Sequence, residues 1–324
     1  MEVYHGLTSL PAPVAGAVLT IGNFDGVHRG HAALVATAQR VAAHFSAPVL
    51  AVTFDPHPLA VLAPERAPAP LTTLAEKLAL LERLGVGHAL VLRSEPALLT
   101  QQAGDFLASL VAHCRPRALV EGPDFSFGRG RGGNVDTLRA HAERWGYEVH
   151  EVPAARCTEL PTHPIISSTS IRQALVDGRV DAAGVMLGRP YRVVGRTGHG
   201  AGRGATLGFP TANVDGIVHL LPQQAVYAAA AQLDDGTLHL AAVNVGPQPT
   251  FDQARCRVEV HLLGFRDDVR GQTIGVHFLA RLREQRRFAG PEELIRQIRR
   301  DVEATRGLAD RIADLKRHAP LALT

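Results

Sequence analysis

The side chains best suited to chemistry in the first half of the sequence are two histidines, His28 and His31, separated by an arginine and a glycine. Apolar residues before them predict a buried strand over 17–21, and the apolar residues after them take up helical spacing to residue 45. A glycine-containing loop between a strand and a helix presents backbone N–H groups and the positive end of the helix dipole to a ligand. The arrangement therefore indicates a phosphate site.

A Walker loop is excluded, because it needs a lysine at the start of the helix. The chain has only Lys77 and Lys316, and neither follows a glycine loop. Imidazoles stand there instead, and each can donate a hydrogen bond to a phosphoryl oxygen as negative charge develops on it. The alternative is that both are ordinary surface histidines in a chain with 16 of them. The strand–loop–helix context favours the phosphate interpretation.

The segment Gly22-Asn-Phe-Asp-Gly-Val-His-Arg-Gly-His31 resembles the signature of the bacterial bifunctional riboflavin kinase/FMN adenylyltransferases. These enzymes, also called FAD synthetases, are members of the HxGH nucleotidyltransferases. The resemblance implies that the N-terminal part binds ATP and that both histidines are catalytic. The residues that it implies at this ATP are Gly22, Asn23, Phe24, Asp25, His28 and His31.

Two further segments resemble the flavin site of the family. In Thr53-Phe-Asp-Pro-His-Pro58 the histidine lies between two prolines, which hold it extended and outside any helix. Gly122-Pro-Asp-Phe-Ser-Phe-Gly128 has a proline, Pro123, where the family usually has a free N–H. A rigid loop and simple core packing are the alternatives for these segments. The residues implied at the flavin are His57, Asp124, Phe125 and Phe127.

A hydroxyl-rich segment, Ile165-Ile-Ser-Ser-Thr-Ser-Ile-Arg172, precedes a helical pattern over 173–176. Serine and threonine at a helix N-terminus satisfy its first N–H groups, and capping is the simpler interpretation. The segment also resembles the ISSTxIR motif, which binds ATP phosphates in these nucleotidyltransferases, and both roles are compatible. The residues implied at the phosphates are Ser167, Ser168, Thr169 and Arg172.

A second glycine-rich stretch runs from Gly198 to Asn213 and predicts a loop able to fold over phosphate. A long flexible hairpin loop is the alternative. The stretch resembles the riboflavin kinase signature GRxLGFPTAN. Neutral oxygens suit a hard cation, and the resemblance implies that Thr211 and Asn213 hold Mg²⁺. The residues implied at the kinase ATP are Gly208, Phe209, Pro210, Thr211 and Asn213.

Glu259 lies in Val258-Glu-Val-His-Leu262, where strand alternation predicts that its carboxylate points away from the side of Val258 and Val260. A lone glutamate on a strand usually belongs to a solvated face. The segment resembles the family's VEvhLLDF segment, which implies that Glu259 is the base that takes the proton from the riboflavin 5′-hydroxyl.

Two scaffolds are needed to position these motifs. In the first part, strands alternate with amphipathic helices, which predicts a Rossmann-like, doubly wound parallel sheet in a domain of residues 1–185. In residues 186–324, short strands separated by turns predict an antiparallel β-barrel, followed by one helix from Pro291 to about His318. The expected strands of the first domain are 17–21, 48–54, 88–92, 118–121 and 147–152, and its helices are 31–45, 74–84, 103–113 and 135–145.

The composition is that of a soluble globular protein, with 46% apolar and 20% charged residues. Only 5% of residues are aromatic and the arginines are dispersed, which argues against a nucleic-acid binder. The three cysteines are far apart, so neither a disulfide framework nor a zinc site is expected. No apolar run reaches the roughly 18 residues of a membrane span. We therefore expect a cytoplasmic protein without membrane or nucleic-acid partners.

The expected function is FAD synthesis: Mg²⁺- and ATP-dependent phosphorylation of riboflavin to FMN, then adenylylation of FMN to FAD with release of pyrophosphate. The kinase part departs from the family pattern at Ala205, Ala225, Gly264 and Arg270. The alternative is therefore an FMN adenylyltransferase whose kinase barrel is weakened. An HxGH adenylyltransferase for another phosphate monoester is a rival, but it leaves the segment from Gly208 to Asn213 unexplained.

Overall fold

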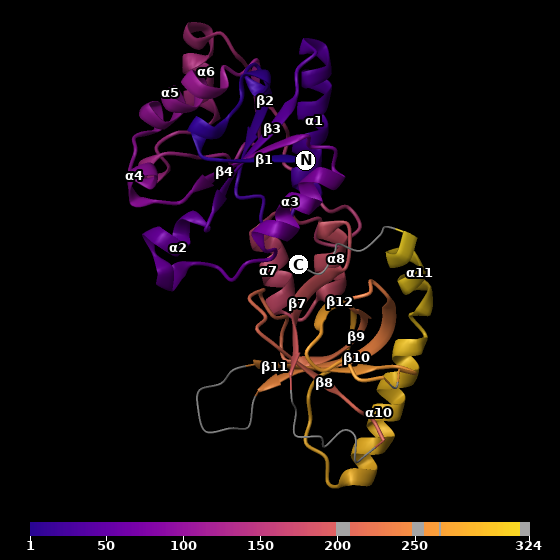
Figure 1. The fold of residues 1–324 in the computed structure, drawn as a ribbon. Coiled ribbons are helices and arrows are strands. Elements are labelled where there is room, and N and C mark those ends of the chain that lie inside the picture. Colours follow the sequence, from indigo (N-terminus) through magenta and orange to yellow (C-terminus); the bar gives the residue numbers. More distant parts are fainter. Residues whose placement is uncertain (199–207, 248–255, 266, 318–324) are drawn as a thin grey trace. The chain divides into compact units, whose positions relative to one another are not determined.

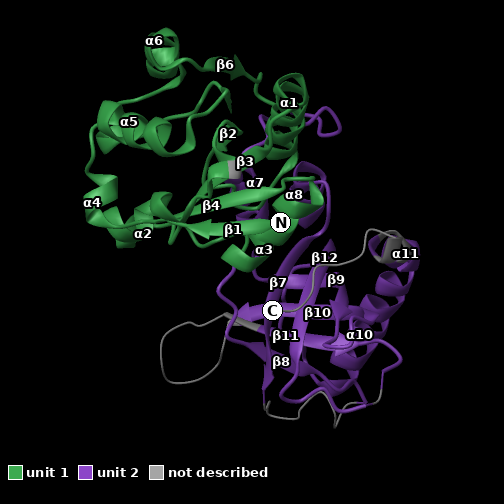
Figure 2. Ribbon diagram, turned by 45° about the horizontal axis from the view of Figure 1, so that its top comes forward, with its two compact units in different colours: residues 1–156 green, residues 157–324 purple. Residues whose placement is uncertain are grey.

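The computed structural model describes residues 1–198, 208–247, 256–265 and 267–317. The chain divides into two compact units, residues 1–156 and residues 157–324 (Figure 2). Unit 1 contains an open sheet and unit 2 a closed barrel. The domain boundary expected after residue 185 stays a prediction.

Unit 1 is built on a six-stranded sheet in the order β1-β4-β3-β2-β5-β6. Every pairing in it is parallel, and β2 and β5 are buried at each position. The order changes direction between β2 and β5, and this switch point is where parallel sheets of this kind bind ligands. The strands are β1 (Glu2–His5), β2 (Val18–Ile21), β3 (Val49–Asp55), β4 (His88–Arg93), β5 (Ala118–Glu121) and β6 (Glu148–Glu151).

Helices cover both faces of this sheet (Figure 1). On one face Ala38 and Ala42 of α1 pack against Val18, and on the other Leu107 of α5 and Leu138 of α6 join the larger core. Both patterns follow from apolar residues at helical spacing facing apolar strands. The helices are α1 (Arg29–Phe45), α2 (Pro58–Leu62), α3 (Leu74–Arg83), α4 (Pro96–Leu99), α5 (Ala103–Cys114) and α6 (Val135–Trp145).

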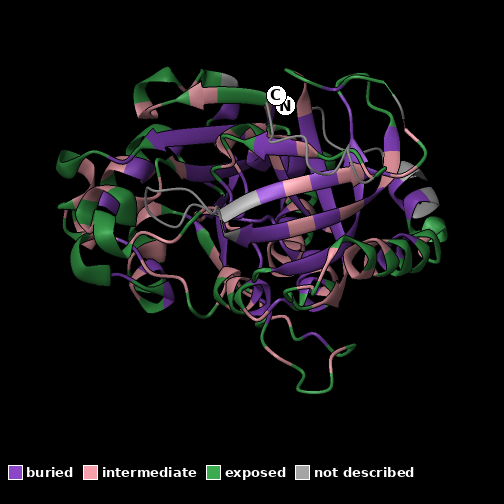
Figure 3. Ribbon diagram, turned by 90° about the horizontal axis from the view of Figure 1, so that it is seen from below, coloured by how far each residue is buried: buried purple, intermediate pink, exposed green. Residues whose placement is uncertain are grey.

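Unit 2 contains a closed antiparallel barrel in the strand order β10-β11-β8-β7-β12-β9. Val243, Val258 and Val276 belong to its apolar interior, whereas Ala230 and Leu238 pack outward against a C-terminal helix. Buried residues accordingly follow the strands, and exposed residues gather on helices and loops (Figure 3). The strands are β7 (Tyr191–Gly198), β8 (Ala212–Asp215), β9 (Ala225–Gln232), β10 (Leu238–Pro247), β11 (Cys256–Leu262) and β12 (Thr273–Arg283).

The C-terminal helix expected from Pro291 to about His318 is two helices, so that prediction is wrong in its continuity. Helix α10 (Pro291–Arg306) ends at Gly307, and α11 (Ala309–Arg317) follows. Glycine has a low helix propensity, which favours a break at Gly307. His318 lies outside the described residues. Within those residues no helix has the length and apolarity needed to cross a membrane.

A helix pair, α7 (Ser168–Val176) and α8 (Val180–Leu187), packs on the barrel. Gly178 in the turn between them has a φ of +74°, and a Cβ there would lie 2.8 Å from Gln223 Oε1 and 3.2 Å from Arg281 Cδ. The backbone N–H of Gln223 donates to Leu175 O at 2.9 Å. Glycine is therefore needed both for the turn and for the close approach of the pair to the barrel.

Candidate active sites

His28 and His31 form a reciprocal cap at the start of α1, which begins at Arg29, two residues earlier than predicted. The His31 backbone N–H donates to His28 Nδ1 at 3.3 Å, and the His28 backbone N–H donates to His31 Nδ1 at 3.3 Å. Because an N–H can only donate, each Nδ1 must accept, and the proton of each neutral imidazole resides on Nε2. The rings stack with centroids 3.6 Å apart. The cap therefore fixes two Nε2–H donors side by side.

The loop before this cap is tied to the rest of unit 1 by Asp25. Its buried carboxylate accepts hydrogen bonds from Leu71 N at 3.0 Å and from Thr72 N at 3.1 Å. The backbone N–H of Gly26 donates to Thr72 Oγ1 at 3.0 Å. Phe24, buried in the core, has a φ of 47°, an uncommon conformation for a residue with a side chain. Asp25 thus holds the loop shape, and the contact with ATP expected of it stays a prediction.

The ends of three neighbouring strands meet at the switch point. The loops after β3, β2 and β5 carry His57, the two capping histidines and Asp124 respectively. His57 Nε2 lies 3.2 Å from Asn23 Nδ2, so two of the predicted site residues are in contact. His57 is extended and caps the short helix α2, in a stretch expected to be loop.

Glu121 bridges the strands that part at this switch point. Backbone pairing between β2 and β5 covers only Val18 with Ala118 and Leu19 with Leu119. Beyond it, the Ile21 N–H donates to Glu121 Oε1 at 2.6 Å. Burial raises the pKa of Glu121 well above its usual 4.5, although the hydrogen bond from Ile21 opposes the shift. The Glu121 side chain therefore continues the link between β2 and β5 past the end of their backbone pairing.

Lys77 is a buried cation near the same loop. Its Nζ lies 3.3 Å from Thr53 Oγ1 and 3.4 Å from Phe54 O, and Thr53 Oγ1 donates to Asn23 O at 3.3 Å. Burial lowers the pKa of Lys77, and the negative charges of Asp25 and Asp55 partly offset that shift. The lysine thus links the end of β3 to the loop that carries Asn23.

The phenylalanines expected at the flavin differ in their surroundings. Phe127 belongs to the core, and its ring lies tilted against the Phe106 ring with the centroids 6.0 Å apart. Its backbone pairs in both directions with Gly133 at 3.0 Å. Phe125 is partly buried and lies 5.3 Å from Phe127, while Asp124 is exposed. Core packing thus accounts for Phe127. Flavin contacts of Asp124, Phe125 and Phe127 stay predictions.

The hydroxyl-rich segment caps α7 in unit 2. Ser167 is the N-cap: its Oγ accepts from Ser170 N at 3.1 Å, and Ser170 Oγ accepts from Ser167 N at 2.9 Å. The expected capping role is therefore confirmed. Ser168, Thr169 and Arg172 follow in the first turns of the helix. Phosphate binding by this segment stays a prediction.

On the barrel, three polar side chains lie in one row across neighbouring strands. Glu259 of β11 pairs in register with Asn213 of β8 on one side and with Asn244 of β10 on the other. Directly paired residues share a face of the sheet, so the three side chains are neighbours. Val258 and Val260 are buried on the opposite face, as the alternation predicted. The expected loop is wrong at its end, because Asn213 lies in the unpredicted strand β8.

The side-chain oxygen of Asn213, the predicted metal ligand, has unused capacity to accept a hydrogen bond or bind a cation. The residue is 4% exposed, and its Oδ1 is buried without a hydrogen-bond partner among the described residues. A buried carbonyl oxygen in that state is costly unless a ligand satisfies it, and hard cations prefer such oxygens. Asn213 therefore fits a Mg²⁺ ligand.

The segment before Asn213 is held against β11. His261 Nδ1 lies 2.8 Å from Pro210 O, and the His261 ring packs edge-on against Phe209 at 5.6 Å. Gly208 and Thr211 are exposed on either side. The predicted kinase residues Gly208, Phe209, Pro210 and Thr211 thus run beside the Glu259 row. Ala205 lies outside the described residues.

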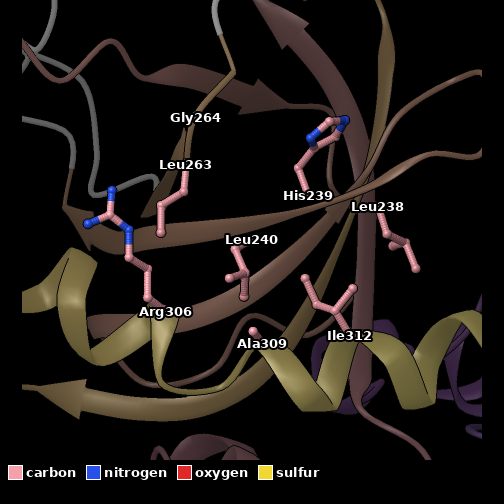
Figure 4. Close-up of a pocket in the computed structure, with 8 residues that line it drawn as sticks. All are labelled: Leu238, His239, Leu240, Leu263, Gly264, Arg306, Ala309 and Ile312. Atoms are coloured by element: carbon pink, nitrogen blue, oxygen red, sulfur yellow. The ribbon is translucent and has the colours of Figure 1, made fainter.

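A separate pocket of about 360 Å³ opens between β10 and the junction of α10 with α11 (Figure 4). Its lining is mainly apolar, with His239 and Arg306 at its edge, and it contains none of the predicted site residues. Gly264, one of the departures from the family pattern, contributes to the lining. Its φ of +72° suits glycine, which explains the residue by backbone geometry.

Sequence reasoning missed Asn244, Gln285, Glu121 and Lys77. Asn244 and Gln285 contact the Glu259 row, and the other two hold the strand ends beside the histidine loop. The alternation of Asn244 with Val243 and Val245 was a readable signal that it faces outward with Glu259. The strand register of the barrel, which makes Asn244 a neighbour of Glu259, could not be predicted from the sequence.

Comparison with known proteins identifies both halves of the chain. Residues 11–170 match the FAD synthetase family, and residues 187–309 match the riboflavin kinase family. A bifunctional riboflavin kinase/FMN adenylyltransferase of Escherichia coli K12 is 40% identical over 304 residues, covering 93% of this chain and 96% of that one. Its counterpart in Bacillus subtilis is 33% identical over 293 residues, covering 89% of this chain and 90% of that one.

A solved structure from Streptococcus pneumoniae, described as a macrolide-efflux protein, shares the fold. It has a TM-score of 0.84 at 29% identity and covers 94% of this chain and 99% of that chain. The two family matches and the near full-length relatives agree with the parallel sheet, the barrel and their motifs. The chain belongs to the family of bifunctional riboflavin kinase/FMN adenylyltransferases.

Proposed function

We propose that this chain makes FAD in two steps, using one ATP in each. Riboflavin and ATP give FMN and ADP on the barrel, and FMN and a second ATP give FAD and pyrophosphate at the histidine loop. The observation that supports the proposal is the pairing of Glu259 with Asn213 on adjacent strands, because it brings a carboxylate beside a buried amide oxygen within a domain that matches riboflavin kinase. The enzyme works in the cytoplasm, where ATP is available.

Adenylylation forms a bond between an oxygen of the FMN phosphate and the α-phosphorus of ATP, and breaks the bond to pyrophosphate. Charge grows on the phosphoryl oxygens during this exchange. His28 and His31 donate to those oxygens from Nε2, since their Nδ1 atoms are held by the cap. Ser167, Ser168, Thr169 and Arg172 bind the ATP phosphates, and the loop Gly22–Asp25 lies along the nucleotide. His57, Asp124, Phe125 and Phe127 bind the flavin.

Phosphorylation begins at the riboflavin 5′-hydroxyl. Its oxygen attacks the γ-phosphorus of ATP and ADP leaves, while the hydroxyl proton passes to the carboxylate of Glu259. Asn213 Oδ1 and Thr211 would hold Mg²⁺, which neutralises charge on the ATP phosphates when bound. Gly208, Phe209 and Pro210 shape the edge of this site and are held there by His261.

Replacing Glu259 with glutamine tests the division of labour. An amide cannot accept the hydroxyl proton, so FMN formation from riboflavin should fall by about a hundredfold or more. FAD formation from added FMN should stay near the wild-type rate, because it uses the other site. Both rates are measured by separating the flavins after incubation with Mg²⁺-ATP. If the wild type makes FAD from FMN but no FMN from riboflavin, the chain is an adenylyltransferase whose barrel has no kinase activity.

A further inference from the structure

Glu259 accepts a hydrogen bond from one of its two flanking asparagines. Asn244 Nδ2 donates to Glu259 Oε2 at 3.2 Å, whereas Asn213, on the other side, presents a buried Oδ1 without a partner among the described residues. The same residue type thus flanks the carboxylate twice in different roles. Since an asparagine amide can turn either its oxygen or its nitrogen to a neighbour, some other group must set the direction of Asn244.

Gln285, in the segment between β12 and α10, supplies that direction. Its Nε2 donates to the backbone oxygen of Val245 at 3.1 Å. A backbone oxygen can only accept, so the nitrogen end of Gln285 must face it. The same Nε2 donates to Asn244 Oδ1 at 2.6 Å. Asn244 therefore receives a donor at its oxygen, and its nitrogen is left to face Glu259.

The backbone leaves space for this arrangement at Gly246. A Cβ added at Gly246 would collide with Nε2 of Gln285. Gly246 is buried in β10, two positions from Asn244, and its φ does not lie in the region that only glycine favours. Glycine at this position thus leaves room for the glutamine amide where it lies.

We propose that Val245 O, Gln285 and Asn244 form a one-way hydrogen-bond relay that orients the base Glu259 in the kinase reaction. Asn244 holds Oε2, so that Oε1 is the oxygen that takes the riboflavin hydroxyl proton. Gln285 and Asn244 are positioning residues and do not touch substrate. The proposal rests on the kinase role of Glu259 proposed above.

Replacing Gln285 with methionine removes the donor while keeping side-chain length and charge. The turnover number for FMN formation should fall about tenfold, the cost of one lost hydrogen bond to a charged or relayed group. The Michaelis constant for ATP should change by less than twofold, because ATP contacts are untouched. Gln272→Met is the matched control: its amide donates to Asp268 O at 3.3 Å, outside the relay, and should leave turnover unchanged.

A double-mutant cycle shows whether Gln285 acts through Asn244. Asn244→Ala alone should lower turnover by a similar factor, and adding Gln285→Met should lower it no further. The relay would be wrong if the double variant lost turnover by the product of the two single factors. It would also be wrong if the turnover number of Gln285→Met stayed within twofold of wild type. FAD formation from FMN should be unchanged in every variant, which separates loss of the relay from general damage to the chain.

Side-chain amide NMR tests the relay without any activity. The Asn244 NH₂ pair, identified by its loss in Asn244→Ala, should shift in Gln285→Met and in Glu259→Gln and stay in place in Gln272→Met. If wild type forms no FMN but the NH₂ pair responds in this way, the kinase proposal fails, and only the hydrogen-bond arrangement of Gln285, Asn244 and Glu259 is retained, without a role in catalysis. If FMN forms and the pair does not respond to Gln285→Met, the relay is wrong and the kinase proposal stands.

Discussion

At the scale of single residues, the two histidines of the loop cap a helix with one ring nitrogen and, as we propose, bind phosphate with the other. Each Nδ1 accepts a backbone N–H of the other residue and closes the first turn of α1, which leaves the proton of each ring on Nε2. Under the proposed function, the same imidazole is therefore both a capping side chain and a phosphate donor. Variants at His28 can separate the two tasks, because asparagine also caps helices well.

His28→Asn should retain the cap and lose the Nε2–H donor. FAD formation from FMN should fall by about a hundredfold or more, the usual cost of one donor to a developing oxyanion, with the melting temperature nearly unchanged. His28→Ala should lose the same activity and also about 1 kcal/mol of stability from the missing cap. FMN formation from riboflavin is the control for both. Equal loss of the two activities would contradict the division into two sites.

Arg172→Lys keeps the positive charge near the α7 cap but loses the planar fork. The Michaelis constant for ATP in adenylylation should rise roughly tenfold, since one charge-assisted hydrogen bond contributes about 1.5 kcal/mol. Arg179→Lys is the control, because Arg179 pairs with exposed Asp177 at 2.8 Å in the next turn of the chain. An unchanged constant in Arg172→Lys would leave the segment with its capping role alone.

At the scale of elements, the buried side chain of Glu121, which links β2 to β5, should make the stability of the fold depend on pH. Burial raises the pKa of Glu121 well above its ordinary 4.5, so the folded chain keeps a proton that the unfolded chain loses. The contribution of Glu121 to the free energy of unfolding is fully present below pH 4.5, and it is lost as the pH rises toward the pKa of Glu121 in the folded chain. The slope is at most about 1.4 kcal/mol per pH unit.

Glu121→Gln should remove that slope. The glutamine oxygen still accepts from the Ile21 N–H and has no proton to release on unfolding. Wild type and variant should thus have similar stability near pH 4.5, and the variant should gain on wild type as the pH approaches 8. Urea unfolding followed by the fluorescence of Trp145 is a suitable measurement, since this single tryptophan lies in α6 of unit 1. Parallel pH profiles would mean that Glu121 ionises in the folded state.

Most elements could be predicted because their signals are local. Strand β5 and helix α6 have the bounds that the apolar pattern gave. The misses have physical reasons. Strand β1 is mostly exposed and lacks the apolar run that marks β5, and β8 follows glycines that favour a loop. The parallel pairing of β1 with β4 depends on tertiary contacts.

The sites divide in the same way. His28, His31 and Ser167 are parts of contiguous motifs, and their caps are formed by residues three positions apart, so sequence sufficed to single them out. Asn244 and Gln285 reach Glu259 from other parts of the chain. Their contact follows from strand register and from the course of the segment after β12, neither of which is written in local spacing.

At the scale of the whole molecule, three departures from the family pattern lie among the described residues, at Ala225, Gly264 and Arg270. Ala225 is buried in β9 opposite Val245, and Arg270 makes a 2.9 Å hydrogen bond with Asp268. Gly264 serves a turn with positive φ. None of the three takes the place of Asn213 or Glu259, so we expect the barrel to be an active kinase.

The two activities should complement each other between molecules. His28→Asn retains the proposed kinase site, and Glu259→Gln retains the proposed adenylyltransferase site. Each variant alone should make little FAD from riboflavin, and an equal mixture should restore it, with FMN passing through solution. The rate should rise with protein concentration, and an FMN-binding competitor protein should suppress it. A mixture no better than its components would mean that FMN does not leave the chain that made it.

The position of the helix pair α7–α8 means that cutting the chain on either side of it would affect residues proposed to act in adenylylation. The FAD synthetase match extends to residue 170, inside α7, yet Leu175 and Gly178 of the pair pack against the barrel at Gln223 and Arg281. A polypeptide ending at residue 156 would abandon Ser167 and Arg172. A polypeptide ending at residue 185 would keep Ser167 and Arg172, but the helix pair that carries them would lose its contacts with the barrel. If Ser167 and Arg172 bind ATP in adenylylation as proposed, splitting the two reactions into separate genes would require a new support for α7, and this favours keeping both activities in one gene.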